Sequence, residues 1–95
     1  MKKYEITFIV RPDMEEADIK KTADEMKKVL TDKKATIVDE KSIGQKELAY
    51  EIKKFNTGYY FYYEIEANKE TIEEFDRVAR LNENLLRHLI IRVED

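Results

Sequence analysis

The sequence predicts an α+β fold in which two amphipathic helices cover one face of a four-stranded antiparallel sheet. Apolar residues alternate in four segments, recur every three or four positions in two others, and the six segments follow the order β-α-β-β-α-β. This order is that of the ferredoxin-like, split β-α-β arrangement. We expect one such domain over residues 1–95, a length that suits a single small core. The expected strands lie near residues 3–10, 36–53, 59–67 and 85–93, and the expected helices near 14–31 and 69–81.

The first strand is predicted from strict alternation. One face carries Tyr4, Ile6, Phe8 and Val10, and the other carries Glu5, Thr7 and Ile9. Pro12 ends the strand, and Asp13 is the expected N-cap of the first helix, with Glu16 completing a start that is similar to a capping box. The apolar stripe of this helix is Ile19, Ala23, Met26 and Leu30.

The second and third strands are expected to form a hairpin. The second strand continues past Gly44, where Leu48, Tyr50 and Ile52 alternate with their neighbours. Residues 54–58 contain an asparagine and a glycine and are expected to form the turn. The aromatic run after it favours a pleated strand. We expect one face to carry Phe61, Tyr63, Ile65 and Ala67, and the open face to carry Tyr60, Tyr62, Glu64 and Glu66.

The second helix is expected to begin after Asn68, a candidate N-cap, and to end at residues 82–84. Its buried stripe is Ile72, Phe75, Val78 and Ala79. Across the whole chain, the residues expected to be buried are Ile6, Phe8, Ile19, Met26, Leu30, Ile65 and Phe75.

Composition excludes several classes of function. The absence of cysteine excludes a disulfide scaffold, a thiolate metal site and a cysteine nucleophile. Eighteen basic and 21 acidic residues give a net charge of −3, so contact with nucleic acid requires a local basic patch. No segment approaches the roughly 20 apolar residues of a membrane helix, and we expect a cytoplasmic protein. We expect no cofactor, no metal and no small-molecule substrate.

An enzymatic role is not favoured. His88 is the only histidine and Ser42 the only serine, and the sequence indicates no positioned partner for a general base. We therefore interpret His88 as a structural or interface residue. Gly44 and Gly58 stand alone, so a phosphate-binding loop is not indicated.

The aromatic run from Tyr59 to Tyr63 has two interpretations. It loosely resembles the third strand of an RNA-recognition motif, in which aromatic residues on the open face stack unpaired bases. However, the first strand offers no aromatic residue on that face, and Glu64 and Glu66 would repel phosphates. We favour the alternative that Tyr60 and Tyr62 cover the sheet or meet a protein partner.

The basic residues also have two interpretations. The fold brings strands from both ends of the chain into one sheet, so Lys2, Lys3, Arg87 and Arg92 are either one local patch or scattered surface charge. The sequence does not decide between these.

Several segments together resemble the family of ribosomal protein six of the bacterial small subunit. They cover essentially the whole chain and are Tyr4-Glu5, Ile9-Val10-Arg11-Pro12, Leu48-Ala49-Tyr50-Glu51-Ile52, Gly58-Tyr59, Glu74-Phe75-Asp76-Arg77 and Leu85-Leu86-Arg87-His88. The resemblance implies a ribosome-associated structural protein that binds the central domain of small-subunit rRNA as a heterodimer with small-subunit ribosomal protein eighteen. The alternative is a free-standing ferredoxin-like module that dimerises through its sheet.

The resemblance also implies the site residues. The expected RNA-binding residues are Lys2, Lys3, Lys46, Arg87 and Arg92, and the expected partner-binding residues are Leu48, Tyr50, Tyr60 and Tyr62. One departure from the family pattern is Gln45-Lys46-Glu47, which keeps one basic residue where many relatives have two or three. With few cations and a net negative charge, we expect weak RNA binding alone and tighter binding once a basic partner is docked.

Overall fold

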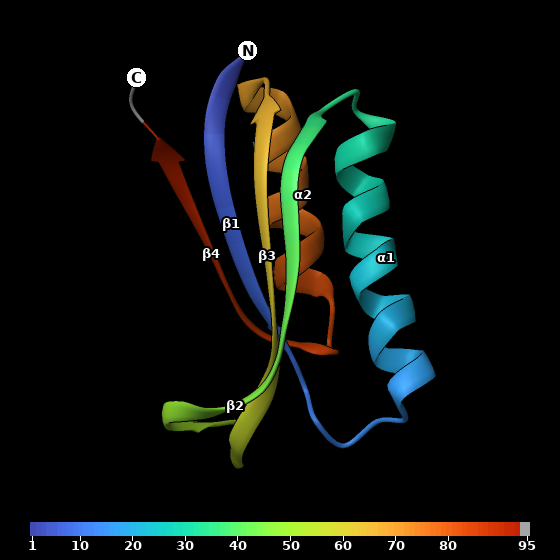
Figure 1. The fold of residues 1–95 in the computed structure, drawn as a ribbon, viewed down its shortest axis with the longest axis vertical. Coiled ribbons are helices and arrows are strands. Elements are labelled where there is room, and N and C mark those ends of the chain that lie inside the picture. The colour runs from blue at the N-terminus through green and yellow to red at the C-terminus, as the bar shows by residue number, and fades with distance from the viewer. Residues whose placement is uncertain (94–95) are drawn as a thin grey trace.

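The computed structural model describes residues 1–93 as an α+β sandwich. Its elements are β1 (Lys2–Val10), α1 (Glu16–Asp32), β2 (Thr36–Ile52), β3 (Phe55–Ala67), α2 (Lys69–Leu81) and β4 (Leu85–Val93). The strands form one antiparallel sheet in the order β2-β3-β1-β4, and both helices lie on the same side of it (Figure 1). The predicted ferredoxin-like fold is therefore confirmed. No helix within residues 1–93 is both long and apolar enough to cross a membrane.

The core lies between the helices and the covered face of the sheet. Phe8 of β1 is at its centre and stacks on Phe61 with ring centroids 5.3 Å apart. Its ring also meets Tyr63 at 5.6 Å and Phe75 of α2 at 6.3 Å, both in tilted geometry. The seven residues predicted to be buried are all buried: Ile6, Phe8, Ile19, Met26, Leu30, Ile65 and Phe75.

The start of α1 differs from the prediction. The helix begins at Glu16 with Glu15 as its N-cap, and Asp13 lies outside it. Both carboxylate oxygens of Asp13 accept hydrogen bonds from Arg11, from Nε at 2.6 Å and from Nη2 at 2.8 Å. This bidentate, charge-assisted pair engages both carboxylate oxygens, and it holds the pKa of Asp13 below its usual value. For α2, Asn68 is the N-cap residue, as predicted, but its side chain makes no capping bond.

The β2–β3 turn is tighter than predicted. Residues 55–58 belong to β3, and Ile52 pairs directly with Phe55. Only Lys53 and Lys54 connect the strands, with φ of +50° and +70°. Two successive residues with positive φ are the geometry of a type I′ turn. The prediction was wrong because this turn favours asparagine and glycine, and two lysines give no such signal.

Cross-strand register orders the side chains of the open face into rows. At the hairpin end of this face, one row contains Gly44, Tyr60, Ile9 and Arg87. The next row contains Lys41, Tyr62, Thr7 and Leu89. We call the third row the acidic end, and it contains Asp39, Glu64, Glu5 and Ile91. Charge on the open face is therefore unevenly distributed along the strands.

Candidate nucleic-acid and partner interface

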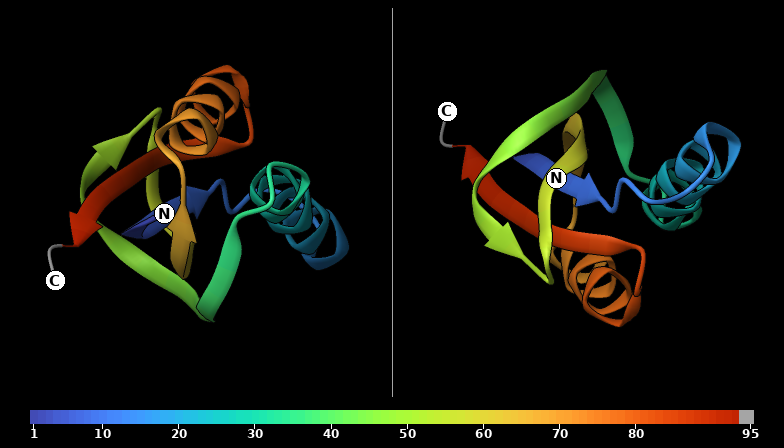
Figure 2. Two further views of the ribbon diagram at one scale, coloured as in Figure 1. Left: turned by 90° about the horizontal axis from the view of Figure 1, so that it is seen from above. Right: turned by 90° about the horizontal axis from the view of Figure 1, so that it is seen from below.

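The β2–β3 hairpin extends beyond the sheet and bends toward the β4 side (Figures 1 and 2). The bend coincides with a shift in register, because Glu47 pairs with Thr57 whereas Ile52 pairs with Phe55. Extra residues on one strand of a pair increase its bend and twist. The bend brings Tyr50 of β2 against Arg87 of β4, which donates a hydrogen bond from Nη1 to the Tyr50 hydroxyl at 2.6 Å.

The contact leaves most of the tyrosine ring accessible. The Arg87 guanidinium carbon lies 6.0 Å from the ring centroid of Tyr50. Together with the hydrogen bond, this distance places the guanidinium at the hydroxyl end of the ring, and Tyr50 remains 60% exposed. A second arginine contact is made next to the turn of the hairpin, where the guanidinium carbon of Arg11 lies 5.4 Å from the ring centroid of Phe55.

Lys46 also belongs to the hairpin end. It pairs with Gly58, which shares the open face with Tyr60 two residues later. A Cβ built on Gly58 would meet the side chains of Ile9 and Leu86, which confirms that this position faces the open side. The structure therefore gathers five of the predicted site residues at one end of the molecule: Lys46, Leu48, Tyr50, Tyr60 and Arg87.

The other predicted cations lie elsewhere. Lys3 pairs with Val93 on the open face, six residues along β1 from the row that contains Arg87, or about 20 Å at the usual rise per residue. Arg92 pairs with the core residue Tyr4, so it is on the helix-covered side. Lys2 pairs with Ala67 and is on that side too. The structure does not gather these residues and Arg87 into one patch. The spacing of five between Arg87 and Arg92 signals opposite faces, and this signal was present in the sequence.

The middle rows and the acidic end combine apolar and negative side chains. Leu89 and Ile91 of the edge strand β4 are 48% and 49% exposed. Across the sheet, burial and then the charges of Glu5 and Glu64 raise the pKa of the Tyr62 phenol. No aromatic side chain of β1 is on this face, since its open positions in the three rows are Ile9, Thr7 and Glu5. This surface suits an apolar, positively charged protein segment better than stacked bases.

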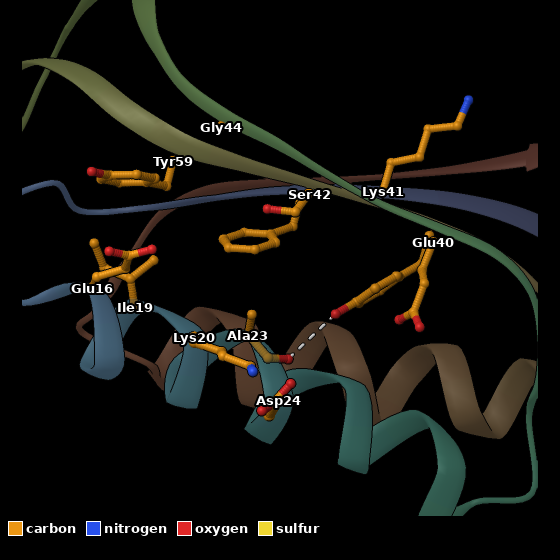
Figure 3. A pocket seen from close by; sticks show the side chains of 12 residues that line it. Glu16, Ile19, Lys20, Ala23, Asp24, Glu40, Lys41, Ser42, Gly44 and Tyr59 are labelled. Carbon is orange, nitrogen blue, oxygen red and sulfur yellow. Dashed lines mark hydrogen bonds between the residues drawn. The ribbon is translucent and has the colours of Figure 1, made fainter.

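The opposite side of the sheet has a groove of about 480 Å³ between α1 and β2 (Figure 3). Its apolar floor consists of Ile19, Ala23, Tyr59, Phe61 and Tyr63. The Tyr63 hydroxyl donates a 3.5 Å hydrogen bond to the Ala23 carbonyl, and burial raises the pKa of that phenol to about 12. None of the predicted site residues lines this groove.

His88 has a structural position. Its Nε2 lies 2.7 Å from Asp76 Oδ1, and its side chain is only 17% exposed. Arg80 Nη2 contacts the other oxygen of Asp76 at 3.1 Å. The contact between His88 and Asp76 joins β4 to α2, and it holds the pKa of Asp76 below its usual value. Within residues 1–93, no three histidine or carboxylate side chains come together in a way that would hold a metal ion.

The family model for ribosomal protein S6 matches residues 3–92. The chain belongs to the ribosomal protein S6 family. The crystal structure of 30S ribosomal protein S6 from Thermotoga maritima is similar to this S6-family chain throughout, with a TM-score of 0.92 and 27% sequence identity. The match covers 97% of this chain and 87% of that one. The resemblance seen in the sequence is therefore confirmed, and the S6 family is one of structural proteins of the small ribosomal subunit.

Proposed function

We propose that this chain binds the central domain of small-subunit rRNA together with small-subunit ribosomal protein eighteen, without catalysis, on ribosomes in the cytoplasm. One observation carries the proposal. The cations Lys46 and Arg87 lie at the hairpin end of the open face, whereas the acidic end carries three carboxylates and the exposed Ile91, with Lys3 one row beyond them. The positive hairpin end and the largely acidic, apolar rows suit two different partners.

The RNA contacts are assigned to the basic residues. Lys46 and Arg87 supply the hairpin end, while Lys2, Lys3 and Arg92 supply a second group near the start of β1 and the end of β4. Each phosphate contact adds only a modest, salt-dependent increment to affinity. A chain with net charge −3 therefore needs a basic partner for tight binding to RNA.

The protein partner is assigned to the tyrosine-bearing part of the open face. Tyr60 and Tyr62 are half-buried there, and Leu48 is half-buried in the extended hairpin. Leu89 and Ile91 add exposed apolar area that the sequence interpretation had not included. The nearby carboxylates Glu5 and Glu64 complement positive charge on a partner.

The test is a binding measurement on three components: this chain, ribosomal protein eighteen and a central-domain RNA fragment. We expect weak RNA binding by the chain alone and much tighter binding by the heterodimer at the same salt concentration. Nanomolar RNA binding by the isolated chain at physiological salt would contradict this division between the two proteins.

A second candidate function rests on the edge strand β4, whose exposed Leu89 and Ile91 are also suited to a second copy of the chain. Such a free-standing module would form a discrete homodimer in high salt. The ribosomal function instead predicts that the chain co-purifies with small-subunit particles.

A further inference from the structure

We propose that Tyr50 and Arg87 form a nucleotide-binding site in which Tyr50 stacks on an unpaired base and Arg87 binds an adjacent phosphate. The inference rests on the proposed rRNA binding and assigns Tyr50 to the RNA, in place of the partner-binding role expected from the sequence. It follows from the contact between the two side chains and from the charge around them.

The geometry leaves both functional groups available. Tyr50 is 60% exposed, and Arg87 touches its hydroxyl end, so the ring surface stays open for stacking. The hydrogen bond holds the ring in place, which lowers the entropic cost of binding a base. Arg87 uses Nη1 for this bond, and a guanidinium has four further N–H donors for phosphate oxygens.

The surrounding charge favours a polyanion. The hairpin segment 44–54 together with Arg87 carries four basic side chains and two acidic ones: Lys46, Lys53, Lys54 and Arg87 against Glu47 and Glu51. Lys53 and Lys54 are both exposed at the turn. The hairpin end is therefore locally positive in a chain whose net charge is −3. Aromatic rings interleaved with cations are the usual surface for single-stranded nucleic acid.

The same features specify the form of RNA. An A-form duplex keeps its bases stacked, and its narrow major groove does not admit a tyrosine ring. Stacking on Tyr50 requires a base from a loop, a bulge or a strand end. The site therefore reads an unpaired nucleotide, whereas the remaining cations contact phosphates without such selectivity.

The stacking is tested with a fluorescent reporter. The chain contains no tryptophan, so Tyr50→Trp introduces a single fluorescent reporter. Complexes made with the wild-type chain give the background emission from ribosomal protein eighteen. We expect emission from Tyr50→Trp to be quenched when the central-domain fragment joins the heterodimer, and to be unchanged when the partner joins alone. Leu81→Trp is the matched control, because Leu81 is 69% exposed on α2, and its emission should not respond.

Affinity measurements separate stacking from charge. Tyr50→Leu should weaken RNA binding by the heterodimer roughly 5- to 150-fold without changing the salt slope. Tyr50→Phe keeps the ring and should bind within about threefold of wild type. Arg87→Ala should reduce the magnitude of the salt slope by about 0.7 to 0.9, the value for one phosphate contact.

Three results would overturn the inference: unquenched Tyr50→Trp in an RNA-bound complex, wild-type RNA affinity in Tyr50→Leu, or loss of the heterodimer in Tyr50→Leu with its circular dichroism unchanged. Failure of the wild-type heterodimer to bind the RNA would instead overturn the proposed function, so the two failures are distinguishable.

Discussion

Gly58 of β3 and Ile9 of β1 lie so close on the open face that Gly58 has no room for a Cβ. The atom would collide with Ile9 Cγ2 and would also approach the Val10 carbonyl at 3.4 Å and Leu86 Cδ1 at 3.5 Å. The regular pairing of β2 with β3 ends one residue away, at Glu47 and Thr57. The close contact therefore fixes the base of the element that presents Tyr50.

Gly58→Ala should destabilise the fold by about 1–3 kcal/mol, because the added methyl group overpacks a site bounded by backbone and side chains. Urea denaturation measures the change. Adding Ile9→Ala removes the colliding atom, so the double variant should lose less stability than the sum of the two single variants.

Gly44→Ala provides the contrasting case. A Cβ there would meet nothing within 4 Å, but its φ is +99°. Its destabilisation should therefore come from backbone strain, at about 1–2 kcal/mol, and Ile9→Ala should not reduce it. A stability change in Gly58→Ala that is additive with Ile9→Ala would contradict the steric explanation.

Phe75→Ala should destabilise the fold by about 3–5 kcal/mol, because the ring is fully buried against Phe8 and the lost volume leaves a cavity. The free energy of unfolding in urea gives the value. Leu81→Ala, at an exposed position of the same helix, should change it by no more than about 0.5 kcal/mol. Equal effects of the two substitutions would show that the α2 register is wrong.

Replacing Lys53 and Lys54 with Asn and Gly should stabilise the protein by about 1 kcal/mol, since both lysines hold positive φ values that asparagine and glycine adopt with less strain. For a domain of this size, the thermal midpoint should rise by about 4–8 °C. The reversed pair of substitutions, Lys53→Gly with Lys54→Asn, removes the same two positive charges but places the two residues in the opposite order. It therefore separates the effect of turn geometry from that of charge, and it should stabilise the protein less. An unchanged midpoint would argue against the type I′ turn.

At acidic pH, the free energy of unfolding should depend on the protonation state of the Asp76 carboxylate. The hydrogen bond from His88, followed by the charge of Arg80, holds the pKa of Asp76 below its usual 3.8. The Asp76 carboxylate thus binds a proton more weakly in the folded state than in the unfolded state. The contribution of Asp76 is present above pH 3.8 and is lost as the pH falls through the lower pKa of the folded protein.

Asp76→Asn should therefore be less stable than wild type near pH 6, and the difference should shrink between pH 5 and pH 2 as the wild-type carboxylate takes up its proton. Thermal midpoints across that range provide the measurement. Leu81→Ala, which removes no titratable group from an exposed position of α2, is the control and should show no comparable trend. A constant difference at every pH would refute the titration of Asp76 as the cause.

The double substitution Leu89→Ala and Ile91→Ala should weaken binding of ribosomal protein eighteen by about tenfold or more, because interface residues that matter each contribute above 1 kcal/mol on truncation. Isothermal titration gives the affinity. Val38→Ala removes a similarly exposed apolar side chain from β2 and should leave it unchanged. If the double variant instead loses self-association in high salt, the dimerising module is favoured.

Alternation made most of the fold predictable. Ile6 and Phe8 of β1, and Ile65 of β3, follow a period of two without interruption, so their burial could be assigned from sequence. The contact between Tyr50 and Arg87 could not. It depends on a register shift between Glu47 and Ile52, which breaks the period and bends the hairpin toward a strand that lies far away in the sequence.

Because β1 is an inner strand and its neighbour β4 follows all the other described elements, the sheet is completed only after β4 has been made. A ribosome making this protein releases β1 long before residues 85–93 emerge. Until then, the nascent chain presents the β4-facing edge of β1 with unpaired backbone groups, which is a template for wrong pairing. Slowing translation between α2 and β4 should therefore increase aggregation of this protein more than slowing it between β1 and α1.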